Sequence, residues 1–385
     1  MNKIYTTKIL KINNTEQLKS LSIEAGKTYS EIVTKFYRIL RKKNIFLSKY
    51  SIQKLIKNNN LHSQTVQGLT DKFYTAWDAY KEAKKINPNA KPPKNRKKHF
   101  CIIYKESAIK LKGKCLTISN GNHNEKLIFN NWKHDKPKYI EISYNDGYKM
   151  SCTYSIPDVK PMIGYIAGID LGAIQLASIY TQDRVLLYSG KLIRAKQRYA
   201  NKTKAEFSSM MDKLKKNSRK WRKLNKKKNK LLNKLKRQIK DIEHKQTTHL
   251  VETLHKSSVA TVVIGDIRNV RKASPKTGKI NKKASTQQVN QMPTGFIRRL
   301  ITYKANRLGM EVKLINEAYT SQTCPNCEVK NKVTNRNYVC SVCGFSYHRD
   351  GVGAFNIYKK YVKKYKGCVP VVGVMTPPIG HRYIA

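Results

Sequence analysis

Four cysteines near the C-terminal end restrict the possible folds of this chain more than any other feature. They form the pattern Cys324-Pro-Asn-Cys327 and, after twelve intervening residues, Cys340-Ser-Val-Cys343, which is followed by Gly344. Two Cys-x-x-Cys turns at this separation can place four thiolates tetrahedrally around one Zn²⁺ ion. Because four thiolates complete the coordination shell, we expect one structural zinc without an open position for chemistry.

Other interpretations of the cysteines have less support. Two disulfides would use the same four residues, but nothing else in the sequence indicates an oxidising compartment. His348 lies close to the second turn, and we expect it to be a contact residue rather than a fifth ligand. The remaining cysteines are scattered, which is typical of buried or free thiols: Cys101, Cys115, Cys152 and Cys368.

The charge of the chain indicates the class of its partner. Of 385 residues, 78 are lysine or arginine and 24 are aspartate or glutamate, for a formal net charge of +54. A compact protein with this charge repels itself strongly unless a polyanion binds it. No apolar stretch approaches the ~18–20 residues of a membrane span, and the first residues lack the apolar core of a signal peptide. We therefore expect nucleic acid as the partner and no membrane association.

The N-terminal part of the chain has the pattern of strands around a helical block. Residues 4–12 read as a strand, apolar residues then recur at helical spacing to about residue 85, and short strands separated by turn residues follow from 100 to 154. The pattern predicts a small β-barrel or sandwich of residues 1–14 and 90–160, with a helical domain of residues 15–89 inserted after its first strand.

The C-terminal part alternates strands and helices, which indicates an α/β domain. Apolar strands begin near residues 166, 259 and 310. Residues 191–245 carry 22 basic and 4 acidic side chains and a thin apolar seam, so we expect long basic helices that face phosphates. The predicted parts are an α/β domain of residues 161–320 and 346–367, a zinc ribbon of residues 321–345 and a C-terminal tail of residues 368–385.

Scarce acidic residues stand at the ends of these elements. Asp170 ends one apolar strand, Asp266 ends another, Glu317 lies near the end of a third, and Asp350 begins the last helix. Neighbouring parallel strands bring their C-terminal ends to one edge of the sheet, where ligands bind. Carboxylates gathered there suit two Mg²⁺ ions, because hard cations prefer oxygen ligands. The alternative is that each acid only caps a helix or turn.

These motifs closely resemble the TnpB and Fanzor proteins, transposon-associated RNA-guided nucleases related to the type V CRISPR effectors. The resemblance is strong over about residues 160–360 and weaker over the N-terminal part, where residues 61–67 look like that family's recognition helices. The motifs that carry it are Gly168-Ile-Asp170-Leu-Gly172, Tyr319-Thr-Ser-Gln-Thr-Cys324 and Arg349-Asp350-Gly-Val-Gly-Ala354-Phe-Asn356-Ile357.

The resemblance implies a RuvC-type, RNase H-like nuclease domain interrupted by the zinc ribbon. It also implies a bound guide RNA that pairs with target double-stranded DNA. The N-terminal β-barrel would be the wedge domain and the inserted helices the recognition domain, and together they would read a short motif adjacent to the target. The basic helices of residues 191–256 would line the channel for the RNA–DNA heteroduplex.

One position departs from the family pattern. Family members usually end the second strand with Ile-Glu-Asp, whereas this chain has Ile264-Gly265-Asp266. The acid at 266 is displaced by one residue, which on a regular strand points it to the opposite face. We expect Glu317, on the neighbouring strand, to take the place of the missing glutamate, with Gly265 leaving room for it. The predicted catalytic and magnesium-binding residues are thus Asp170, Glu317 and Asp350, with Asp266 a weaker fourth.

The predicted function is RNA-guided, Mg²⁺-dependent cleavage of DNA by a protein that is monomeric in its ribonucleoprotein. Its cofactors would be one structural zinc, two magnesium ions and the guide RNA. The alternative is an inactive RNA-guided DNA-binding protein that acts as a repressor or targeting factor, which Gly265 favours and the intact Asp170 and Asp350 oppose. We expect an intracellular, DNA-associated protein. It would lie in the nucleus if it comes from a eukaryote or its virus, and otherwise in the cytoplasm or nucleoid.

Overall fold

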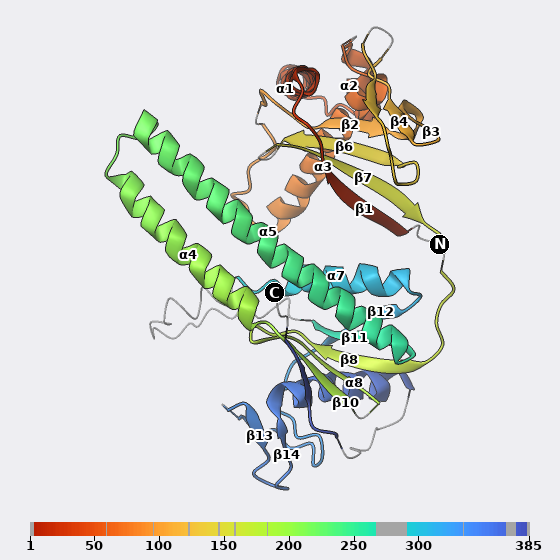
Figure 1. Cartoon of the computed structure of the whole chain (residues 1–385), viewed down its shortest axis with the longest axis vertical. Coiled ribbons are helices and arrows are strands. Elements are labelled where there is room, and N and C mark those ends of the chain that lie inside the picture. The colour runs from red at the N-terminus through yellow and green to blue at the C-terminus, as the bar shows by residue number, and fades with distance from the viewer. Residues whose placement is uncertain are drawn as a thin grey trace. The chain divides into compact units, whose positions relative to one another are not determined.

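The computed structural model divides into two compact units, Met1–Pro157 and Asp158–Ala385, which we call the N-terminal and C-terminal units. Figure 1 shows the elements of each. The residues that the structure describes are 4–58, 60–94, 96–121, 124–144, 147–157, 159–182, 184–266, 291–333, 335–366 and 375–382. Within these ranges, no helix is long and apolar enough to cross a membrane.

The N-terminal unit contains two antiparallel sheets and three α-helices. Its elements are β1 (Ile4–Lys11), α1 (Glu16–Lys43), α2 (Lys49–Leu55), α3 (Ser63–Ile86), β2 (Ile102–Lys105), the short 3₁₀ helix η1 (Glu106–Ala108), β3 (Ile109–Lys112), β4 (Cys115–Ile118), β5 (Leu127–Phe129), β6 (Tyr139–Tyr144) and β7 (Tyr148–Ile156). The sheets have the orders β1-β7-β6-β2 and β3-β4-β5. The described strands thus form two sheets, and the small β-barrel or sandwich expected from the sequence stays a prediction.

Aromatic side chains on α1 and α3 form the core between these helices. Phe36 and Phe73 are fully buried, with ring centroids 4.9 Å apart in an edge-to-face arrangement. Trp77 lies one helical turn beyond Phe73, and its ring is 5.0 Å from that of Phe36. Such pairs each stabilise a core by about 0.5–1.5 kcal/mol beyond their burial. The apolar periodicity of this segment thus corresponds to real helical faces.

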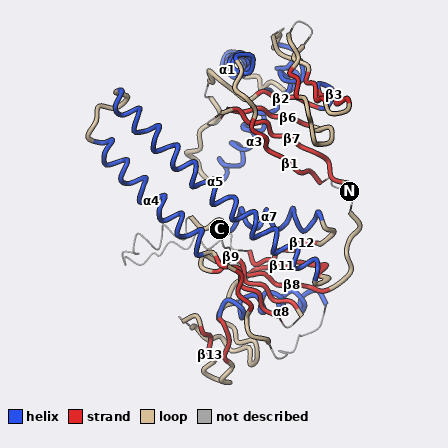
Figure 2. The backbone as a smooth tube through the Cα atoms, in the orientation of Figure 1, coloured by secondary structure: helices blue, strands red, loops and turns tan. Residues whose placement is uncertain are grey.

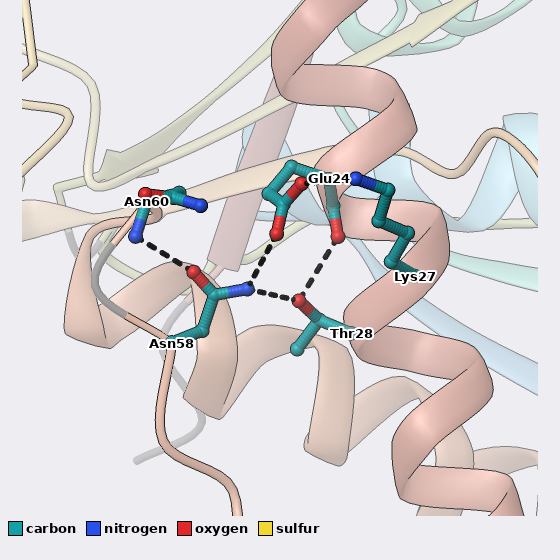
Figure 3. A network of polar contacts seen from close by, with 5 residues as sticks. All are labelled: Glu24, Lys27, Thr28, Asn58 and Asn60. Carbon is teal, nitrogen blue, oxygen red and sulfur yellow. Dashed lines mark hydrogen bonds and ion pairs between the residues drawn. The ribbon is translucent and has the colours of Figure 1, made fainter.

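A polar network attaches the connection between α2 and α3 to α1 (Figure 3). The amide nitrogen of Asn58 donates to Glu24 Oε1 at 3.1 Å and to Thr28 Oγ1 at 2.7 Å. Its amide oxygen accepts from the backbone N–H of Asn60 at 2.7 Å. Lys27 pairs with Glu24 at 3.1 Å, and these contacts together lower the pKa of the Glu24 carboxyl despite the opposing effect of burial.

The C-terminal unit is built on one mixed sheet. Its elements are β8 (Tyr165–Asp170), β9 (Gln175–Thr181), β10 (Arg184–Ser189), α4 (Lys191–Asp212), α5 (Arg219–Lys256), β11 (Val259–Asp266), α7 (Thr294–Arg307), β12 (Glu311–Asn316), β13 (Asn337–Val339), β14 (Ser346–His348), α8 (Arg349–Lys366) and β15 (Ile379–His381). The large sheet has the order β12-β11-β8-β9-β10-β15, and β13 and β14 form a separate hairpin.

Strand direction places three C-terminal ends at one edge of the sheet. β8, β11 and β12 are mutually parallel, with Ile264 paired to Ile169 on one side and to Leu314 on the other. β9 runs antiparallel beside β8, and β10 runs antiparallel beside β9. The parallel trio agrees with the prediction from the alternation of strands and helices. The sequence analysis did not identify β9 and β10, which follow β8 directly without a helix between them.

The two faces of this sheet are covered by different helices, as Figure 2 shows. One face carries Ile169 and Ile264 and packs against α5 and α7. The other carries Val263 and Ile315 and packs against Ile357 of α8. Successive residues of a strand point to opposite faces. A residue's number along these strands therefore decides whether its side chain lies on the α8 side or on the α5–α7 side.

Candidate metal centres

The four cysteines of the double Cys-x-x-Cys pattern come together in the described structure. Their Sγ atoms all lie within 4.8 Å of one another. The Sγ atoms of Cys324 and Cys343 are 3.6 Å apart and those of Cys327 and Cys340 are 3.5 Å apart. These distances exceed the ~2.05 Å of a disulfide. They are close to the roughly 3.8 Å edge of a tetrahedron with Zn–S bonds of about 2.3 Å. The cluster therefore fits one zinc ion.

The backbone of each turn holds its thiolates in place. The N–H groups of Glu328 and Gly344 donate to the carbonyls of Cys324 and Cys340, respectively, each at 3.1 Å. Both residues have positive φ angles, 60° and 70°. Gly344 adopts this conformation without steric cost because it has no Cβ. His348 is not part of the cluster among the described residues, in keeping with its expected role as a contact residue.

Asp170 ends β8 on the face of the sheet that α8 covers. Gly168, two residues earlier and on the same face, lies so close to α8 that an added Cβ would be 2.4 Å from the carbonyl of Ala354. At Gly353 an added Cβ would be 2.5 Å from Asp170 Oδ2. Glycine is disfavoured inside helices, so this close approach explains its presence in α8. The helix thereby lies directly over the Asp170 carboxylate.

Glu317 reaches the same face from the neighbouring strand. Ile315 is paired with Gly265 and belongs to the core under α8, and Glu317 follows two residues later. A Cβ added at Gly265 would lie 2.7 Å from Glu317 Oε2 and 3.2 Å from Glu317 Cβ. Any larger residue at 265 would therefore meet the Glu317 side chain. The glycine leaves the space that this glutamate fills.

Asp266 lies on the opposite face, as the pleat of the strand requires. Asp266 is two residues beyond Ile264 and therefore lies on the same face as Ile264, which packs against α5 and α7. Its Oδ1 atom is 3.3 Å from Nη1 of Arg298 on α7. Arg298 thus pairs with an acid at the sheet edge. Arg268 and Arg271, which follow β11 in the sequence, fall outside the described residues.

Asp350 is held by two arginines at the junction of the hairpin and α8. Its carboxylate lies 2.5 Å from Nη1 of Arg336 and 3.7 Å from Nε of Arg349. β14 runs directly into α8, and the Arg349 N–H donates to the carbonyl of Arg336 at 2.8 Å. The ribbon therefore sets the position of the first turn of α8. Sequence reasoning missed Arg336, because it lies in the ribbon and only the fold brings it to Asp350.

The three carboxylates on the α8 side repel one another. Burial and the charges of Glu317 and Asp350 raise the pKa of Asp170 to about 7. Burial and the charge of Asp266 raise the pKa of Glu317, and its Oε2 atom is buried without a hydrogen-bond partner among the described residues. A bound cation would offset the repulsion and coordinate this oxygen. The donor set, which consists only of oxygen atoms, fits Mg²⁺.

A cleft opens on Asp170 and Asp350. It has a volume of about 230 Å³ and is lined by Asp170, Asp350, Arg336 and Arg349, among others. A larger cleft of about 490 Å³ beside it shares Gly172, Ala173 and Arg194 with the first. Arg194 belongs to the first turns of α4, the beginning of the basic helices. Positive side chains thus surround the acids, an arrangement that suits a phosphate group approaching a metal-loaded site.

Comparison with known proteins supports the family that the motifs resemble. A family model described as Cas12f1-like, TNB domain matches residues 295–357, and one described as probable transposase matches residues 150–271. A TnpB-like protein of Acidianus two-tailed virus is 30% identical over 211 residues, covering 54% of this chain and 44% of that protein. A TnpB-like protein of Methanocaldococcus jannaschii is 30% identical over 128 residues, covering 32% and 44%.

The chain is similar to the TnpB-type relatives of the type V CRISPR effectors.

Solved structures show that the fold of the chain is similar to that of the Cas12 proteins. A chain from a Cas12f1–sgRNA–target DNA complex superposes with a TM-score of 0.59 at 14% identity, covering 88% of this chain and 81% of that chain. CasPhi-2 (Cas12j) bound to crRNA gives a TM-score of 0.53 at 10% identity, covering 97% and 99%. By contrast, the chain spans about half the length of the curated relatives it matches.

Proposed function

We propose that this chain is an RNA-guided DNA endonuclease with a RuvC-type, RNase H-like site in its C-terminal unit. The observation that carries the proposal is the convergence of Asp170, Glu317 and Asp350 on the α8 face of the sheet. Glu317 occupies space that Gly265 leaves open, and within the described part of the chain its buried Oε2 has no hydrogen-bond partner. A site retained only for binding nucleic acid would have no need of three mutually repelling acids.

The three carboxylates would hold Mg²⁺, with Asp266 on the far face a weaker candidate. Bound Mg²⁺ supplies a Lewis acid for the phosphodiester and lowers the pKa of an attacking water. Asp170 would contribute oxygens from the end of β8 and Glu317 from just beyond β12, on either side of β11. Arg336 and Arg349 fix the Asp350 carboxylate and counter negative charge at the cleft. Because these parts are built on strands and a helix, the site is held rigidly for in-line attack.

The proposed partners are a guide RNA and double-stranded target DNA with a short adjacent motif. The solved relatives named above contain sgRNA and target DNA or crRNA. α4 and α5 cover the strongly basic segment of residues 191–245, and we assign them to the RNA–DNA heteroduplex. The N-terminal unit would grip the RNA scaffold and read the adjacent motif, as wedge and recognition domains. One copy of the chain would suffice in the ribonucleoprotein.

Cleavage by the purified ribonucleoprotein tests this function. The protein is co-expressed with RNA transcribed from the sequence flanking its own reading frame, and then mixed with matched DNA that carries randomised bases beside the target. We expect cleavage with Mg²⁺, none with EDTA, and none of unmatched DNA. Gel electrophoresis and sequencing of the ends report the products. Guide-dependent DNA binding without cleavage in Mg²⁺ would contradict a nuclease and favour the inactive DNA-binding alternative.

A further inference from the structure

A cleft in the N-terminal unit lies far along the chain from the carboxylates and has no role in the proposed chemistry. Its volume is about 680 Å³, within the range of small-molecule sites. Three segments line it: the first turns of α1 with the residues before them, the chain that enters β2, and the β6–β7 hairpin. The lining residues used below are Asn14, Lys19, Lys97, Phe100, Tyr144 and Tyr148.

Two aromatic walls of this cleft are held in place by other contacts. The ring of Phe100 stacks on Tyr29, with centroids 4.2 Å apart. Tyr148 is buried, and its backbone N–H donates to Asn14 Oδ1 at 3.1 Å. Burial raises the pKa of the Tyr148 hydroxyl. These rings are therefore pre-organised for a flat ligand.

Tyr144 is a third ring, and it is exposed. Tyr144 is 63% exposed to solvent. Tyr148 contacts it edge-to-face, with centroids 5.1 Å apart. An exposed ring supported from one side leaves its other face open, and a planar base can stack there at little conformational cost.

The rim of the cleft carries positive charge. Lys97 is exposed at the rim, and Lys19 lies on the α1 side, where it pairs with Glu16 at 3.1 Å. Asn14, which also lines the cleft, accepts through its amide oxygen, and its amide nitrogen is a further donor group. Rigid rings inside and cations at the rim match one nucleotide, whose base is flat and whose phosphate is anionic. In a chain of net charge +54, a nucleic acid is the complementary occupant.

We propose that this cleft binds one unpaired base of the RNA, stacked on Tyr144 against the walls formed by Phe100 and Tyr148. Sequence-specific recognition of RNA typically uses bases that are splayed out of a loop or bulge and stacked on aromatic side chains. The identity of the RNA as the guide rests on the proposed function. The binding of an unpaired base does not, because it needs neither Mg²⁺ nor the carboxylates.

Binding measurements in EDTA test the proposal independently of cleavage. The full chain is titrated against a short fluorescein-labelled single-stranded RNA, the same RNA annealed to its complement, and the single-stranded DNA of the same sequence. Raised salt weakens phosphate contacts and makes stacking a larger share of the affinity. The variants are Tyr144→Ala, Tyr144→Phe and, as a matched control, Tyr50→Ala, which removes a tyrosine that is 72% exposed on α2.

We expect Tyr144→Ala to raise the Kd for single-stranded RNA by about fivefold or more. Tyr144→Phe and Tyr50→Ala should stay within about twofold of the unaltered protein, and duplex RNA should bind all four proteins alike. Photo-crosslinking of RNA that contains 4-thiouridine should yield adducts on the peptides that carry Tyr144 or Tyr148.

Three results would overturn the proposal. The first is an unchanged Kd in Tyr144→Ala with no crosslink to these peptides. The second is an equal loss of affinity for duplex RNA, which would indicate a general backbone contact. The third is an equal loss for single-stranded DNA, which would assign the cleft to single strands of either kind rather than to RNA. Each of these binding results can be interpreted even if the protein does not cleave DNA.

Discussion

Replacing Glu317 by glutamine is expected to slow DNA cleavage on the order of 10²–10³-fold while guide-dependent DNA binding stays intact. Glutamine keeps the size and one oxygen of the side chain but removes the charge that would hold a cation beside Asp170. Burial and nearby negative charge raise the pKa of Glu317, so a neutral side chain is tolerated by the fold. The loss should therefore lie in the cleavage step, measured as a single-turnover rate with saturating ribonucleoprotein.

The matched control for this variant is Glu311→Gln. Glu311 begins the same strand, is 58% exposed and pairs with Lys313 on the surface. Its charge lies outside the cleft, so its loss should change the cleavage rate by less than about twofold, because exposed ion pairs contribute little. Full cleavage by Glu317→Gln would contradict the rearranged site. Equal losses in both variants would indicate a general effect of charge on this strand.

Loss of zinc is expected to abolish cleavage as well, by a different route. Cys343→Ser removes one of four thiolates, and structural zinc sites of this kind contribute about 10–16 kcal/mol of apparent binding free energy. Without the ion, the hairpin that carries Arg336 loses its support, and Asp350 loses the partner that lies 2.5 Å away. We expect zinc content, measured by mass spectrometry of the metal, to fall from one per chain to near zero, together with cleavage.

Cys115→Ser is the control for the zinc variant. Cys115 lies on β4 in the N-terminal unit, away from the cysteine cluster. This variant should keep its zinc and its activity. A Cys343→Ser protein that loses zinc but cleaves at the normal rate would contradict the proposed support of Asp350 by the ribbon. Asn356 of α8 donates hydrogen bonds to the carbonyls of Thr320 and Thr323 at the start of the ribbon, each at 2.7 Å. Because these bonds link α8 to the ribbon, we do not expect that outcome.

The sequence predicted those features that depend on local spacing. The cysteine cluster followed from two short turns, and the parallel trio of strands followed from alternating strand and helix patterns. The alternation of side chains along a strand predicted that Asp266 lies on the face opposite the other acids, and in the structure it pairs there with Arg298. Because glycine has no side chain, the sequence also predicted room for Glu317 beside Gly265. In the structure a Cβ at Gly265 would be 2.7 Å from Glu317 Oε2.

Other features depend on contacts between distant segments, which one sequence does not reveal. β9 and β10 are short and nearly continuous in apolar character, so periodicity did not separate them from their surroundings. Arg336 reaches Asp350 only because the hairpin folds onto α8. The sequence does contain one local signal of a close contact between helix α8 and its neighbours. Gly351 and Gly353 lie inside a helix, where glycine is unfavourable, and this marks the close approach of Tyr347 and Asp170.

The central claim is that Glu317 takes the place of an acid at position 265, and exchanging the two positions tests it most directly. The measurement is the single-turnover cleavage rate of Gly265→Glu/Glu317→Gly relative to Glu317→Gly, with thermal unfolding midpoints to verify that both proteins are folded. The two side chains compete for the same space above β11, so we predict that the double variant recovers at least about tenfold in rate, or roughly 1.4 kcal/mol of transition-state stabilisation. A folded double variant that cleaves no faster than Glu317→Gly would contradict the account.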